Sequence, residues 1–147
     1  MTARLALASA ALWLTACGTY ELRGKVIEGP ASRIEFVDAS EPRLAAAGLE
    51  GATFELSLDP QRPGRKRIAT GNVGADGTFS IPVKELGAGF LEYDFGLVFR
   101  LPGHDSAVEY FRLPGRHKRL LVTLARGPDR YSPPLDPAGD LQQFSPR

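Results

Sequence analysis

Apolar and polar residues alternate along much of the chain, which is the pattern of β-strands with one buried face. Between residues 53 and 58, apolar Phe54, Leu56 and Leu58 are separated by Glu55 and Ser57. Successive side chains of a strand point to opposite faces, so this period of two places one face on a core and the other in solvent. The same alternation predicts strands at 92–101 and 120–124, and shorter or less regular patterns predict strands at 21–27, 33–37, 67–72, 78–83 and 107–113.

Turn signals separate these predicted strands. Asp76-Gly77 lies between two apolar runs and predicts a β-hairpin, because glycine accepts a positive φ at little steric cost. Glycine and proline together mark further turns at 29–30, 63–64, 102–103 and 114–115. Helix is expected only for a turn or two, at 42–47 and 83–86. Seven or eight short strands at this spacing predict an all-β fold, either a sandwich or a barrel.

Composition and charge narrow the classes of function. The chain has 147 residues, with 18 Lys and Arg against 17 Asp and Glu, so its charge gives no reason to expect nucleic acid as a partner. The single cysteine excludes an intramolecular disulfide and a cysteine-based zinc site. Residues 126–147 are rich in Pro, Asp and Ser, and we expect them to form a largely disordered tail.

The amino terminus has the features of a secretion signal. Arg4 precedes an apolar run at 5–14, which is too short to span a bilayer as a helix. The following Leu14-Thr15-Ala16-Cys17 resembles the bacterial lipobox, in which the cysteine is acylated and becomes the first residue of the mature protein. We therefore expect a signal peptide at 1–16, a lipid on Cys17 and a tether at 17–21. The alternatives are an ordinary secretory signal with an accidental cysteine, or merely an apolar amino terminus.

These features predict a location in the cell envelope. Several acyl chains on one residue make a stable anchor, whereas one chain holds only marginally. Gly18, which occupies the position after the cysteine, resembles the sorting pattern of an outer-membrane lipoprotein. We expect the outer membrane or a periplasm-facing membrane.

Four motifs occur in an order that is similar to one known family. They are Gly24-Lys25-Val26, Gly51 to Leu56 (GATFEL), Gly74 to Phe79 (GADGTF) and Leu101 to His104 (LPGH). Together they resemble the carboxypeptidase regulatory-like domains, which are transthyretin-like (prealbumin-like) β-sandwiches. The resemblance implies an antiparallel Greek-key sandwich at 22–125 with no catalytic residues of its own. Two departures are a longer first connection at 28–50 and a histidine, His104, where the family prefers an aromatic residue.

Two basic clusters are the main candidate binding residues. Lys and Arg gather at Arg65, Lys66 and Arg67, and again at Arg116, Lys118 and Arg119. Both clusters would suit anionic lipid headgroups or an envelope polysaccharide near the anchor. The alternative is that they are solvated turns that flank strands.

Catalytic and metal sites have less support in the sequence. No serine lies in a Gly-x-Ser-x-Gly turn, and Asp38, Glu41 and Asp76 lack the dense oxygen spacing of a calcium loop. We expect no metal and no cofactor. The function expected is a non-catalytic module that binds an envelope protein or glycan through loops 28–33, 37–51 and 59–66, or that has a structural role. The alternative is an envelope enzyme with a site near His104, Asp105 and His117.

Overall fold

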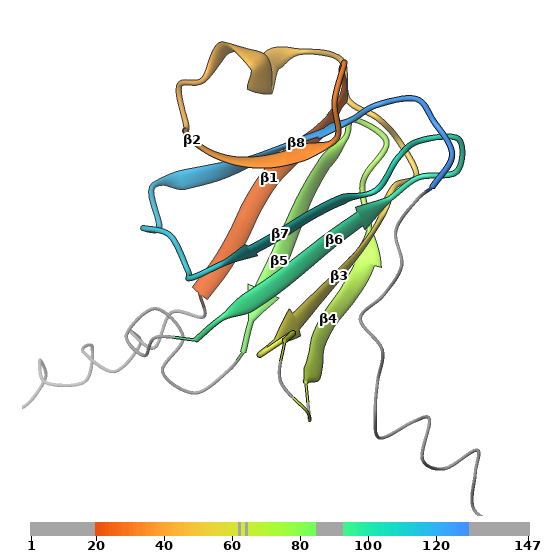
Figure 1. Cartoon of the computed structure of the whole chain (residues 1–147). Helices are drawn as coiled ribbons and strands as arrows, with labels where there is room; N and C mark the ends of the chain where they lie inside the picture. The colour runs from red at the N-terminus through yellow and green to blue at the C-terminus, as the bar shows by residue number, and fades with distance from the viewer. Residues whose placement is uncertain (1–19, 62, 64, 85–92, 130–147) are drawn as a thin grey trace, which may run out of the picture.

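The described residues form a β-sandwich of eight strands, which is one of the two all-β folds that the alternating pattern predicts (Figure 1). The computed structural model describes residues 20–61, 63, 65–84 and 93–129. The only helix among them is a 3-10 turn, η1 (Pro42–Ala45), inside the region where a short helix was expected. The strands are β1 (Tyr20–Glu28), β2 (Arg33–Asp38), β3 (Thr53–Leu58), β4 (Lys66–Asn72), β5 (Thr78–Val83), β6 (Phe95–Arg100), β7 (Ala107–Phe111) and β8 (Lys118–Leu124).

The strands form two four-stranded sheets. Sheet A has the order β2-β8-β1-β5 and sheet B has the order β4-β3-β6-β7. Every neighbouring pair is antiparallel except β1 and β8, which run parallel. The first and last strands of the fold are therefore neighbours in the interior of sheet A.

The core lies between the inner faces of the two sheets. Phe79 of sheet A and Phe99 of sheet B are in ring contact there, with centroids 4.8 Å apart. Aromatic pairs at this separation add to the stability that their burial supplies. The largest fully buried side chains are Leu22, Val26, Leu56, Ile81, Val83, Phe95, Leu97, Phe99, Leu120, Val122 and Leu124, with Leu121 on the opposite face of sheet A.

The connection 39–52 covers the outer face of sheet A. Leu44 of η1 packs on Ile27, Val37 and Leu121, which form a second, smaller apolar cluster. The Leu49 amide then donates to the Val26 carbonyl oxygen at 2.9 Å. The longer first connection expected at 28–50 thus contains the strand β2, and the part of it after β2 covers the outer face of sheet A.

The strand directions divide the sandwich into two ends. At the end that we call the Tyr20 end, β1, β4, β6 and β8 begin and β2, β3, β5 and β7 end. The opposite end is the Glu28 end, where the described chain finishes after β8, in blue (Figure 1). Gly127 is still held there, because its amide donates to the Gly103 carbonyl oxygen at 3.1 Å. Within the described part of the chain, no helix has the length and apolar character needed to cross a membrane.

Candidate functional site

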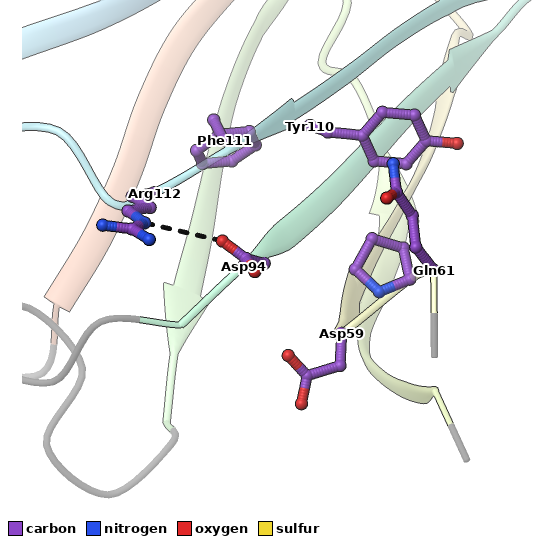
Figure 2. A pocket seen from close by; sticks show the side chains of 7 residues that line it. Asp59, Gln61, Asp94, Tyr110, Phe111 and Arg112 are labelled. Carbon is purple, nitrogen blue, oxygen red and sulfur yellow. Dashed lines mark ion pairs between the residues drawn. The ribbon is translucent and has the colours of Figure 1, made fainter. Parts of the chain in front are cut away.

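A pocket of about 620 Å³ lies on the Tyr20 end of sheet B. Three segments line it: the turn after β3, the residue before β6, and the end of β7 with the residue that follows. Figure 2 shows the Tyr110 ring on one side of this space and the Asp94–Arg112 ion pair on the other. The lining residues are Asp59, Pro60, Gln61, Asp94, Tyr110, Phe111 and Arg112.

Backbone geometry positions the β3–β4 turn beside this pocket. Asp59 has a φ of 47°, and its amide donates to the Asp94 carbonyl oxygen at 2.8 Å. A Cβ on Gly96 would lie 2.8 Å from Cβ of Pro60, so only glycine lets the turn pack this closely over β6. Gly96 pairs with Tyr110 of β7, which brings Pro60 and Tyr110 to the same outer face.

The pocket combines an exposed aromatic ring with charged and amide groups. Tyr110 is the one large hydrophobic residue in the described chain that is exposed, at 44%. The Arg112 Nε atom lies 3.5 Å from Asp94 Oδ1, and both side chains of this pair are exposed to solvent. An exposed ring flanked by carboxylates and an amide can pack on an apolar surface and accept or donate hydrogen bonds around it. This chemistry suits binding, and the pocket holds no nucleophile with an adjacent base.

Both predicted basic clusters lie at the same end of the sandwich. Arg65, Lys66 and Arg67 lead into β4, where Arg67 pairs with Glu55 at 3.1 Å. At the start of β8, Lys118 pairs with Asp38 at 2.9 Å, and Arg119 donates to the Lys118 carbonyl oxygen. The clusters thus share the Tyr20 end, although they belong to different sheets.

Tyr20 is held firmly at this end. The Arg116 guanidinium lies 5.5 Å from the centre of the Tyr20 ring, and the Tyr20 hydroxyl donates to the Pro114 carbonyl oxygen. Burial raises the pKa of Tyr20, and the charge of Arg116 partly opposes that change. The first described residue is therefore fixed to the β7–β8 connection.

The three residues of the alternative enzyme site do not come together. His104 and Asp105 lie at the Glu28 end, next to Ala125 and Arg126. His117 lies just before β8, at the Tyr20 end, so the whole of this strand, about 20 Å, separates it from them. A single site made of His104, Asp105 and His117 is ruled out by this arrangement.

His104 and Asp105 take part in contacts that join the turn after β6 to the ends of β1 and β8. His104 Nε2 lies 3.6 Å from Glu28 Oε2, and Arg126 pairs with the same carboxylate at 3.1 Å. Arg126, by its hydrogen bonds, lowers the pKa of Glu28. Ser32 is occupied as well, because its hydroxyl donates to the Asp105 carbonyl oxygen and accepts from the Ala125 amide. The serine is therefore not placed as a nucleophile.

The acidic residues considered for a calcium site do not form a cluster, and the carboxylate of each is hydrogen-bonded to another residue. Asp76 accepts from the Thr78 amide and hydroxyl, Asp38 pairs with Lys118, and Glu41 pairs with Arg43. No cluster of three or more His, Cys, Asp or Glu side chains occurs among residues 20–61, 63, 65–84 and 93–129.

The three predicted contact loops also lie apart from one another. Loop 28–33 is at the Glu28 end, loop 37–51 covers sheet A, and loop 59–66 is at the Tyr20 end. Only the last of these borders the larger pocket. A second pocket, of about 380 Å³, lies along sheet B between Thr53, Glu55, Asn72 and Arg100.

Sequence reasoning missed the pocket because its residues come from three separated segments. The position of Tyr110 did indicate an exposed ring, because the period of two places it on the face of its strand opposite to the inward Ala107 and Phe111. Asp59 and Asp94 had no such signal in the sequence, because acidic residues are common at the ends of strands. Cys17 lies outside the described residues.

Comparisons with known proteins add no relative: no family model, curated protein or solved structure matches the chain.

Proposed function

We propose that this protein is a non-catalytic, lipid-anchored module of the cell envelope, held to a membrane through Cys17. The sequence supports the anchor with a charged start, an apolar run and a cysteine that follows small residues. The observation that carries the proposal is the start of β1 at Tyr20, three residues after Cys17. A folded domain that begins this close to the lipobox leaves no room for a long linker, so the lipid would hold the sandwich itself at the bilayer.

We propose that the pocket beside Tyr110 is where the module contacts an envelope protein or glycan. Loops on a rigid scaffold carry recognition more often than the strands between them. Tyrosine is enriched at binding surfaces because it offers a large rigid contact area together with a polar hydroxyl. Among the described residues, the most exposed large hydrophobic side chain, Tyr110, borders the larger pocket.

We also propose that the sandwich belongs with the carboxypeptidase regulatory-like domains. The four motifs of the resemblance lie in β1, at the entry to β3, in the β4–β5 hairpin and in the turn after β6. These positions fit the roles that the family gives them. The resemblance supports a binding or structural role without catalysis.

The anchor is tested by metabolic labelling with a radioactive or clickable palmitate. The wild-type chain is expected to incorporate label and to sediment with membranes. Cys17→Ser is expected to lose the label and to keep its signal peptide, whereas the matched Thr19→Ser variant behaves as wild type. Label that persists in Cys17→Ser would lie on another residue and would rule out Cys17 as the acylated one. The chain has no other cysteine, so this label would not be on a thiol.

The binding site is tested by photo-crosslinking in cells. A photoreactive amino acid at position 110 is expected to capture one dominant partner, and the same group at Ala75 is not. Ala75 is exposed at the opposite end, on the tip of the β4–β5 hairpin, so it samples abundant neighbours equally well. Equal capture from both positions would count against a specific partner at the pocket and favour a structural role.

A further inference from the structure

The charges of the sandwich are unevenly divided between its two ends. The described residues include 14 Lys and Arg and 13 Asp and Glu. We count the Tyr20 end as the two outermost residues of each strand there, with the described parts of the β3–β4, β5–β6 and β7–β8 connections. Its cations are Arg65, Lys66, Arg67, Lys84, Arg112, Arg116, Lys118 and Arg119, against the anions Glu21, Asp38, Asp59 and Asp94.

The rest of the described chain has the opposite sign. It carries six Lys and Arg against nine Asp and Glu. The protein is therefore close to neutral as a whole but has a net charge of +4 at the Tyr20 end and −3 elsewhere. By sequence, Arg62, Glu85 and Glu92 belong to the connections at the Tyr20 end and lie outside the described residues; adding them leaves its excess positive.

Most of these cations are accessible to a partner. Lys66, Arg67, Lys84, Arg112 and Arg116 are exposed. The ion pairs at this end, such as Lys118 with Asp38, are also in solvent, where such pairs contribute little and exchange readily. A flat anionic surface can therefore attract the cations without a large rearrangement.

The position of the amino terminus indicates which surface this is. Two residues, Gly18 and Thr19, separate Cys17 from Tyr20, so the three residue steps between them span at most about 11 Å. The Debye length at physiological salt is about 8 Å. If Cys17 carries the lipid, the cations around Tyr20 stand within or close to the electrostatic field of the membrane. The Glu28 end, about 26 Å away along β1, stands outside it.

We infer that the Tyr20 end is a membrane-contact surface, which lies against the anionic phospholipid headgroups of the bilayer that holds the anchor. This inference rests on the proposed lipid at Cys17 for its geometry and on the charge division for its chemistry. The lipid fixes one point, and the cations fix the orientation of the sandwich. The negative Glu28 end then points away from the membrane, and the pocket beside Tyr110, on the outer face of sheet B, opens to the side, where a partner beside the bilayer can reach it.

The orientation is tested with the acylated full-length protein in vesicles, after mass spectrometry has verified the acyl chains. Cys17 is the only native cysteine and its thiol would be blocked, so an added cysteine takes a single fluorescent probe. His117→Cys puts the probe at the Tyr20 end and Ala75→Cys puts it at the Glu28 end. With quencher-labelled headgroups in vesicles of anionic lipid, the probe at 117 is expected to be quenched much more strongly than the probe at 75.

Charge reversal shows whether the cations cause this orientation. Arg65→Glu with Lys84→Glu changes the net charge by −4 at the Tyr20 end, and Lys25→Glu with Arg33→Glu makes the same change elsewhere. Each basic residue near an anionic membrane strengthens binding roughly five-fold, so the first double variant is expected to lose roughly half or more of the quenching at 117. The second is expected to keep it. Thermal unfolding of each variant verifies that it is folded.

Failure of the anchor and failure of the contact surface give different results. Equal quenching at 117 and 75, or equal loss in both double variants, would overturn the contact surface while leaving the anchor intact. Absence of acyl chains would overturn the anchor. In that case the same two double variants, made in Cys17→Ser and sedimented with anionic vesicles, decide the surface: selective loss in the Arg65, Lys84 variant supports it, and equal binding overturns it.

Discussion

The rings of Phe36 and Phe111 meet edge to face, with their centroids 5.1 Å apart and their planes at 60°. Phe36 belongs to β2, an edge strand of sheet A, and Phe111 belongs to β7, an edge strand of sheet B. Among the described strands, no backbone ladder joins the two sheets, so this side-chain contact links their two edge strands along one side of the sandwich.

The first prediction concerns this ring pair. Phe36→Leu and Phe111→Leu are expected to destabilise the fold, and the double variant to lose less than the sum, with a coupling of about 0.5–1.5 kcal/mol. The measurement is urea unfolding of the four proteins in a double-mutant cycle. Phe79, whose ring packs with Phe54 and Phe99, serves as the control partner. A coupling of Phe36 to Phe79 as large as that to Phe111 would contradict a direct contact.

The second prediction compares two glycines with nearly the same backbone angle. Gly77 has a φ of 79°, and a Cβ on it would lie 2.5 Å from Cα of Gly48. Gly51 has a φ of 77° and nothing within 4 Å of the same position. Gly51→Ala is therefore expected to lower the free energy of unfolding by about 1 kcal/mol through the backbone alone. Gly77→Ala adds a backbone clash and is expected to lose at least about 2 kcal/mol, as denaturant unfolding will show.

The third prediction tests the cover on sheet A. Leu44 is partly buried against Ile27, Val37 and Leu121, so Leu44→Ala is expected to cost about 1–2 kcal/mol of unfolding free energy. Ala47→Ser, at an exposed position of the same connection, is expected to stay within about 0.5 kcal/mol of wild type. Hydrogen exchange offers a second measurement, with faster exchange of the Leu49 amide in Leu44→Ala. Equal stability of the two variants would mean that the connection does not hold the sheet.

The fourth prediction is a loss of stability in acid. Hydrogen bonds from the Thr78 hydroxyl and amide lower the pKa of Asp76. The carboxylate in the folded chain therefore stays ionised to lower pH than in the unfolded chain, where its pKa is about 4. The stability it contributes is complete above that pH and disappears as the pH falls through the folded pKa.

Asp76→Asn tests this sign directly. The variant is expected to be less stable than wild type at pH 7, and the difference is expected to shrink towards pH 2. The measurement is the midpoint of thermal unfolding across that range. Thr78→Val removes one of the two donors and is expected to have a smaller effect of the same sign. A difference that grows in acid would contradict the account.

The alternation of single strands was enough to predict the all-β class and most strand positions. The strand expected at 21–27 is β1, and the pattern at 78–83 matches β5. The apolar run from Leu120 to Val122 also carried a signal, because continuous apolar residues predict a strand covered on both faces. Leu121 is fully buried under the connection 39–52, whereas a loop free to bind a partner was expected there.

Pairings between distant strands could not be predicted in this way. Periodicity reports which face of a strand is buried and not which strand lies beside it. The parallel pairing of β1 with β8 and the meeting of Asp59, Asp94 and Tyr110 both depend on such neighbours. The basic clusters were recognised from the sequence, but their sharing of one end follows from the register.

The interior position of β8 imposes an order on folding. β8 is the last of the described strands, yet it separates β1 from β2 and supplies hydrogen-bond partners to both. The chain between β2 and β8 has to close into a loop, at a cost in entropy, before the contacts of β8 with β1 and β2 can stabilise the fold. Folds dominated by pairings between distant strands therefore form slowly, in milliseconds to seconds. A chain that ends before Lys118 would retain β1 and β2 with no strand between them. The domain is therefore expected to remain incompletely folded and accessible to proteases until β8 has been synthesised and has paired with β1 and β2.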